Sequence, residues 1–104
     1  MAFQLTIDEQ QDQIVLYPQG ELDMYYASDF KEQSLEAYEK AKKDVLIDGG
    51  RLDYVDSTGL GGFMYLLKEV REDGHKIFMK DIKDNIRKLF TITQLDAMFT
   101  FIEE

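Results

Sequence analysis

The sequence predicts an α/β fold with a mixed sheet of four or five strands and helices packed mainly on one side. Short apolar runs alternate along the chain with longer runs of helical spacing, and the first two apolar runs follow each other directly. Alternating strands and helices are typical of parallel strands joined by crossover helices, whereas two adjacent strands favour a hairpin. A length of 104 residues suits one domain, so we assign residues 1–104 to a single unit.

Two strands open the chain. In the first, apolar and polar residues alternate as in a strand with one buried face, and the apolar ones are Phe3, Leu5 and Ile7. The second strand follows a short polar turn and includes Pro18. Proline has no N–H to donate to a ladder, so we expect Pro18 near a sheet edge or a strand end. The pair predicts an antiparallel hairpin.

Apolar residues at steps of three and four mark two long helices. The first covers 24–43, and Asp23 or Ser28 could cap its N-terminus. The second covers about 58–73, with Gly74 as its C-cap.

Buried strands are expected after each long helix. Dense apolar runs predict strands at 44–48 and 76–80, while 51–55 reads as a connection to the second helix. Asp84 could cap a third helix. The segment 98–102 is expected to form a last strand or a terminal helix.

The charge balance excludes some classes of partner. The chain has 21 acidic and 12 basic residues and a formal charge of −9, which argues against nucleic acid and against an anionic membrane surface. No apolar run approaches the roughly 18 residues that span a bilayer. With no cysteine and no signal-peptide pattern, we expect a cytoplasmic protein that is a monomer when free. The acidity could serve solubility or steer the protein toward a basic partner.

No set of residues predicts an enzyme. Ser57 lies outside any Gly-x-Ser-x-Gly pattern, and His75, the only histidine, lies at the far end of the same predicted helix. About 16 helical residues would separate the two by about 24 Å, which is too far for a serine–histidine pair. We therefore assign no catalytic residue.

Neither a metal site nor a phosphate-binding loop is predicted. The carboxylates Asp48, Asp53 and Asp56 lack the spacing of an EF-hand and its final glutamate. Gly61 and Gly62 belong to no glycine-rich phosphate loop, and they could instead let a helix pack closely against the sheet or a partner. We expect no metal and no cofactor.

The turn before the second long helix carries side chains with two possible roles. Asp56, Ser57 and Thr58 directly precede an apolar-periodic run, where side-chain oxygens cap the free N–H groups of a helix. A phosphate on a hydroxyl there would lie beside the positive end of the helix dipole. On the residues alone, a simple cap and a phosphorylation site both stay open.

Three motifs are spaced along the chain. The sequence Val-Asp-Ser-Thr-Gly-Leu-Gly at 55–61 is preceded by Gly-Glu-Leu-Asp at 20–23, and Arg-Lys-Leu-Phe at 87–90 is followed by Ile-Thr-x-Leu at 92–95. Together they resemble the STAS domain family, and specifically its free-standing bacterial anti-sigma factor antagonists, in which the last motif belongs to the third helix. The resemblance covers nearly the whole chain and implies a single STAS-like domain.

This resemblance implies a partner-switching function. Such antagonists bind an anti-sigma factor that is also a serine kinase, and binding releases the sigma factor. The kinase phosphorylates the serine after the aspartate, here Ser57; the phosphorylated form dissociates, and a separate serine phosphatase restores it. One departure from the family is Gln94, which stands where glycine is frequent.

The residues expected to bind the partner surround Ser57. They are Asp23, Met24, Tyr25, Asp56, Ser57, Thr58, Gly59, Gly61 and Gly62. A phosphate among them would add negative charge to the docking surface and oppose binding without refolding the domain.

Other roles stay open for the same fold. Small STAS proteins also serve as parts of stress-sensing scaffolds or as subunits of lipid-transport complexes, and some are nucleotide-binding modules. The missing phosphate loop argues against the last of these.

Overall fold

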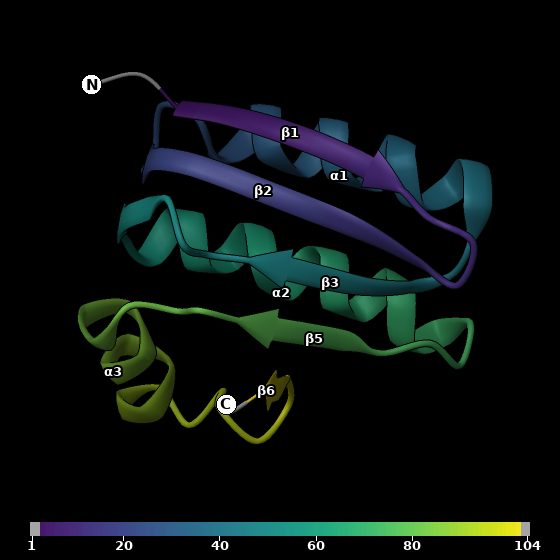
Figure 1. Cartoon of the computed structure of the whole chain (residues 1–104). Helices are drawn as coiled ribbons and strands as arrows, with labels where there is room; N and C mark the ends of the chain where they lie inside the picture. Colours follow the sequence, from purple (N-terminus) through teal and green to yellow (C-terminus); the bar gives the residue numbers. More distant parts are fainter. Residues whose placement is uncertain (1–2, 103–104) are drawn as a thin grey trace.

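Within residues 3–102, six strands and three helices make up the fold, which we describe from a computed structural model (Figure 1). The expected domain limits, 1 and 104, lie outside the described residues. The strands are β1 (Phe3–Glu9), β2 (Gln13–Leu22), β3 (Asp44–Asp48), β4 (Leu52–Val55), β5 (Ile77–Lys80) and β6 (Thr100–Ile102). The helices are α1 (Ala27–Ala41), α2 (Ser57–Glu72) and α3 (Asp84–Ile92).

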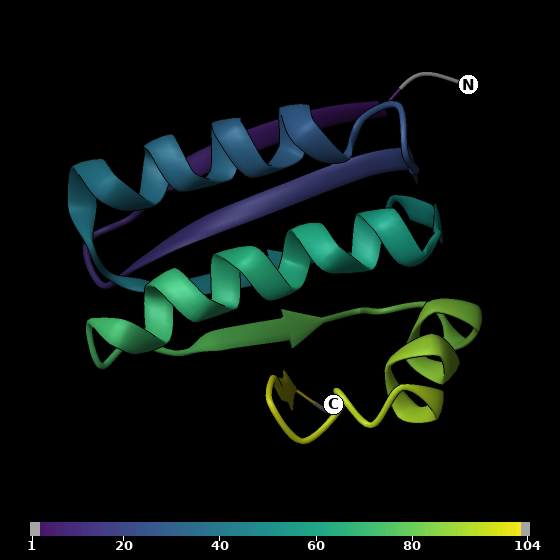
Figure 2. The same ribbon diagram turned by 180° about the vertical axis from the view of Figure 1, so that it is seen from behind.

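The described strands form one mixed sheet in the order β1-β2-β3-β5-β6, with β4 paired to β2. β1 and β2 are antiparallel, which confirms the predicted hairpin, and all other pairs are parallel. α1 and α2 lie side by side on one face of this sheet (Figure 2). The α/β architecture with helices mainly on one side is therefore confirmed.

β4 is the strand that the sequence did not reveal. We expected a sheet of four or five strands and a plain connection over 51–55, but β4 makes a sixth strand. Leu52 and Val55 are buried and the two residues between them are exposed, so the segment lacks the alternation typical of a strand with one buried face. Its parallel pairing with β2 joins residues far apart in the chain and leaves no local signal.

Pro18 lies in the middle of β2, so the expectation of an edge or a strand end was wrong. β3 pairs with β2 as far as Leu16, and β4 takes over at Gly20. The N–H of Gly20 points toward this side of β2 and donates to the Arg51 carbonyl at 2.9 Å. Because alternate residues of a strand point the same way, Pro18 faces the gap between its two partner strands. Its missing N–H thus breaks no ladder bond.

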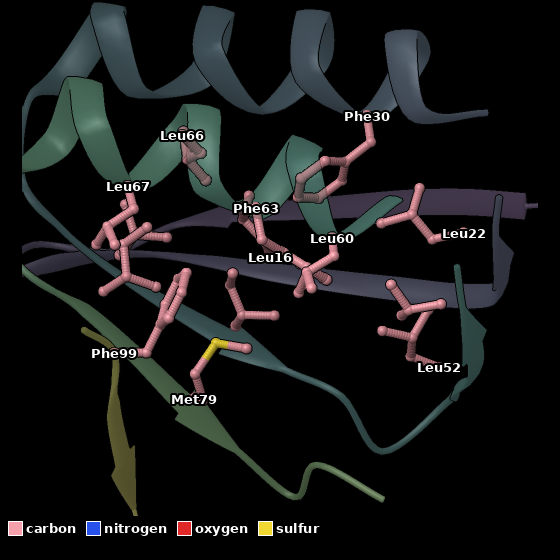
Figure 3. Close-up of a cluster of buried hydrophobic side chains, with 14 of the residues drawn as sticks. Leu16, Leu22, Phe30, Leu52, Leu60, Phe63, Leu66, Leu67, Met79 and Phe99 are labelled. Atoms are coloured by element: carbon pink, nitrogen blue, oxygen red, sulfur yellow. The ribbon is translucent and has the colours of Figure 1, made fainter. Parts of the chain in front are cut away.

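The core lies between the sheet and the helices and is rich in aromatic rings (Figure 3). Phe30 of α1 meets Phe63 of α2 with ring centroids 5.0 Å apart, and Phe63 lies 5.9 Å from Phe90 of α3. Phe99 packs edge-on against Phe90 at 5.2 Å. The buried rings therefore pack α2 against both other helices.

The helices begin and end close to the predicted positions. α1 begins at Ala27, three residues later than expected, and no side chain caps it, so neither Asp23 nor Ser28 has that role. After α3, Gln94 adopts a left-handed backbone with φ of 62°, and Leu95 N donates to the Phe90 carbonyl at 2.8 Å. The last segment forms the strand β6. Among the helices in the described part of the chain, none has the length and apolar character needed to cross a bilayer.

Candidate functional site

Ser57 is the first residue of α2, and its side chain is exposed. The helix is capped by Asp56, whose carboxylate accepts a hydrogen bond from Gly59 N at 2.8 Å. Since Asp56 performs the capping, the Ser57 hydroxyl is not needed for it. Within residues 3–102, no group hydrogen-bonds to this hydroxyl, so it faces solvent. Thr58, the next residue, is also exposed.

Asp56 also ties a distant loop to the start of α2. Its second carboxylate oxygen accepts a hydrogen bond from Met24 N at 3.0 Å. In the same loop, the Asp23 carboxylate accepts from Tyr25 N at 3.0 Å, which forms a tight local turn. One aspartate therefore places Met24 and Tyr25 beside the N-terminus that carries Ser57. In the sequence these two motifs lie 32 residues apart, and the fold brings them together through this hydrogen bond.

Large apolar side chains are exposed around this point. Met24 is 65% exposed and Tyr25 79%, while Tyr65 on α2 is 40% exposed. Tyr54 of β4 is 47% exposed three residues before Ser57, and the sequence did not single it out because β4 itself was not recognised. Exposed tyrosine and methionine are the side chains that protein interfaces favour. We call these four residues together with Ser57 and Gly61 the Ser57 surface.

Gly61 gives the Ser57 surface an open stretch of helix backbone. Ser57, Gly61 and Tyr65 follow one another at steps of four residues, so they lie along one side of α2. A Cβ added at Gly61 would meet nothing within 4 Å. The Nζ of Lys31, on α1, lies over the face of the Tyr65 ring, 4.4 Å from its centroid. Gly61 is therefore not required for packing within the domain, and the space beside it allows a partner to approach the helix closely.

Gly59 and Gly62, by contrast, lie where α2 packs closely against the rest of the domain. Both are buried. A Cβ at Gly59 would overlap the carbonyl oxygen of Leu22, and one at Gly62 would come within 3.2 Å of the Phe30 ring. These glycines allow α2 to approach β2 and α1 and so place the helix N-terminus, while the exposed contacts come from their neighbours.

The acidic residues considered as metal ligands serve separate purposes. Asp48 accepts from Gly50 N, Asp53 pairs with Lys83, and Asp56 caps α2. Among the residues that the structure describes, no group of three or more histidine, cysteine or acidic side chains is placed to hold a metal ion.

The single histidine lies far from Ser57. His75 follows the C-terminal end of α2, whereas Ser57 begins the helix. Its Nδ1 lies 3.3 Å from the Asp44 carboxylate, and its ring packs edge-on to Tyr38. It therefore belongs to a different part of the molecule and cannot activate the serine.

Comparison with known proteins agrees with this arrangement. The family model of the STAS domain matches residues 4–104. The chain is 38% identical to an anti-sigma-B factor antagonist of Listeria monocytogenes over 85 residues, covering 81% of this chain and 74% of that protein. It is 32% identical to the anti-sigma-B factor antagonist of Staphylococcus aureus over 76 residues, covering 73% and 70%.

Solved structures show the same fold. The Bacillus cell fate determinant SpoIIAA, in its phosphorylated form, superposes with a TM-score of 0.73 at 21% identity, covering 99% of this chain and 93% of that one. With the family match over nearly its whole length, the chain belongs to the STAS domain family.

Proposed function

We propose that this protein is an anti-sigma factor antagonist that binds an anti-sigma factor through the Ser57 surface and is switched off by phosphorylation of Ser57. The relatives in Listeria monocytogenes and Staphylococcus aureus carry the first part of this role in their names. The observation that carries the proposal is the exposed, unbonded Ser57 hydroxyl at the capped start of α2, among exposed aromatic side chains.

A phosphate would act on this surface through its charge. It adds about −1.5 to −2 charges, next to the carboxylates of Asp23 and Asp56. The start of a helix accommodates a phosphate without backbone change, so the fold stays as it is. A docked partner would have to bury this charge among tyrosines, and each 1.4 kcal/mol lost weakens binding about tenfold.

The switch requires two further activities, which we assign to partners. The anti-sigma factor would act as the serine kinase, because docking at the Ser57 surface brings it to the hydroxyl that it modifies. A separate serine phosphatase would remove the phosphate. The exposure of Ser57 in the free protein suits access by both enzymes.

Binding measurements with charge variants test the switch. In calorimetry with its cognate anti-sigma factor, Ser57→Asp should bind at least about tenfold more weakly than wild type, which is about 1.4 kcal/mol. Ser57→Ala should bind like wild type, since it adds no charge. Gln11→Asp is the matched control, because it adds the same charge in the exposed turn between β1 and β2, away from α2. Equal affinity of wild type and all three variants would contradict the proposal that charge at Ser57 controls binding.

Mapping the modified residue tests the assignment of Ser57. Incubation with the anti-sigma factor and ATP, followed by mass spectrometry of peptides, should place one phosphate on Ser57. The Ser57→Ala variant should remain unmodified while still binding. Phosphate found only on Thr58 would contradict the assignment.

A further inference from the structure

A groove runs along the second half of α2, at the end of the helix opposite Ser57. It consists of two adjoining hollows of about 320 and 440 Å³, which share Leu67, Arg71 and Met98. α2 forms one side, and the segment that leads into β6 forms the other. From Met64 to Glu72, the last residue of α2, the helix rises about 12 Å, so the groove is elongated. We call it the α2–β6 groove.

The charge of the α2–β6 groove is opposite to that of the protein. Its basic lining residues are Lys68, Arg71, His75 and Lys76, and Glu72 is its one acidic lining residue among those described. The whole chain carries a formal charge of −9. Within residues 3–102, the side chains of Lys68, Arg71 and Lys76 form no ion pair. Cationic groups gathered without partners in an acidic protein provide a site for an anionic group.

The floor of the groove is apolar. Leu67 and Ile77 are buried beneath it, whereas Met98 remains 39% exposed at the point where the two hollows meet. Methionine is flexible and polarisable, and it adapts to apolar groups of different shapes. A ligand that brings both an apolar group and negative charge would therefore match the floor and the rim together.

We propose that the α2–β6 groove is a second docking site, which binds an acidic segment of a partner protein through an apolar anchor at Met98 and carboxylates at Arg71 and Lys76. A span of about 12 Å corresponds to about eight helical residues, which suits a peptide segment better than a compact small molecule. The anchoring groups of the groove are separate from the phosphorylation site, because Ser57 begins α2 whereas Arg71 lies in its last turn.

A peptide titration followed by NMR tests the docking site. The probe is a capped peptide of roughly twelve residues, made of glutamate and leucine with the leucines at helical spacing. It should shift the backbone amides of Arg71, His75 and Met98. Because the protein is strongly acidic, an acidic peptide should bind only where basic groups gather. Two matched peptides, with lysine for glutamate or serine for leucine, should leave those amides unchanged.

Variants separate the groove from general charge effects. Arg71→Glu and Met98→Gln should each lower the affinity for the acidic peptide by about tenfold. Lys88→Glu makes the same charge change on the exposed side of α3 and should bind like wild type, as should Ser57→Asp. Circular dichroism checks that each variant is folded. The result for Ser57→Asp also makes a failure here distinguishable from a failure of the Ser57 switch.

Three outcomes would overturn the proposal. One is a set of shifted amides that lies outside the groove. Another is a lysine–leucine peptide that binds at the same amides as strongly as the acidic one. The third is octanoate shifting Arg71 and Met98 as strongly as the peptide does, which would make the groove a small-anion site.

Discussion

At the residue scale, Gly59 and Gly61 lie in the same turn of α2 but differ in the space around them. Gly59 lies against the Leu22 carbonyl, where any side chain would collide with backbone. Gly61 has open space around it and faces outward with Ser57. A methyl group should therefore harm the fold at the first position and help it at the second.

The matched pair of alanine substitutions tests this difference. Gly59→Ala should lower the free energy of unfolding by about 1–3 kcal/mol, because α2 or β2 must shift. Gly61→Ala should raise it by about 0.5–1 kcal/mol, because alanine favours an exposed helix position. Urea denaturation measures both. If Gly61 also serves close approach, Gly61→Ala should bind the anti-sigma factor more weakly although it is more stable, and unchanged binding would argue against that contact.

At the scale of elements, Asp56 links α2 to the loop between β2 and α1. One of its carboxylate oxygens accepts a hydrogen bond from Gly59 N, and the other accepts one from Met24 N. Met24 and Asp56 are 32 residues apart in the chain. The first bond satisfies an N–H at the helix start, and the second fixes the loop that carries Tyr25. Fold stability and the shape of the Ser57 surface thus depend on the same side chain.

Replacement of Asp56 should separate these two effects. Asp56→Ala should cost about 1–2 kcal/mol of unfolding free energy, because it removes the helix cap. The Met24 amide should then exchange its hydrogen faster, measured by NMR in deuterated water. Asp56→Asn keeps one carbonyl oxygen as an acceptor, so its free energy of unfolding should lie between those of wild type and Asp56→Ala. A Met24 amide that stays protected in Asp56→Ala would show that other contacts hold the loop.

Local sequence patterns predicted the long elements, whereas the contacts between distant segments had to come from the structure. The apolar spacing placed α2, and the polar residues before it placed Ser57 near its start. The four residues of β4 lack the alternation of a half-buried strand, so neither the strand nor the exposure of Tyr54 was predictable. Pro18 was misplaced for a related reason, because the switch of β2 from β3 to β4 depends on that unseen strand.

At the scale of the whole molecule, one hydrogen bond joins the C-terminal ends of α1 and α2. The hydroxyl of Tyr38, a buried side chain, donates to the Asp73 carboxylate at 2.7 Å. Burial raises the pKa of Tyr38 well above its ordinary value, and the hydrogen bond and negative charge of Asp73 act in the same direction. The folded protein therefore holds this proton more tightly than the unfolded chain does.

This difference makes stability depend on alkaline pH. Below about pH 10, both states keep the Tyr38 proton, and its contribution is fully present. Above about pH 10 the unfolded chain loses the proton first, so the free energy of unfolding falls as pH rises. Urea denaturation at about pH 9 and about pH 11 should show a larger loss for wild type than for Tyr38→Phe, which has no such proton. Equal losses would mean that other tyrosines cause the effect.

The turn after α3 holds a glutamine in a backbone geometry that suits a residue without a side chain. Gln94 has φ of 62°, and the hydrogen bond from Leu95 to Phe90 closes the helix around it. A left-handed residue other than glycine costs roughly 1–2 kcal/mol. A glycine at position 94 would adopt this geometry without that cost, so Gln94→Gly would stabilise the end of α3 while keeping the hydrogen bond from Leu95 to Phe90.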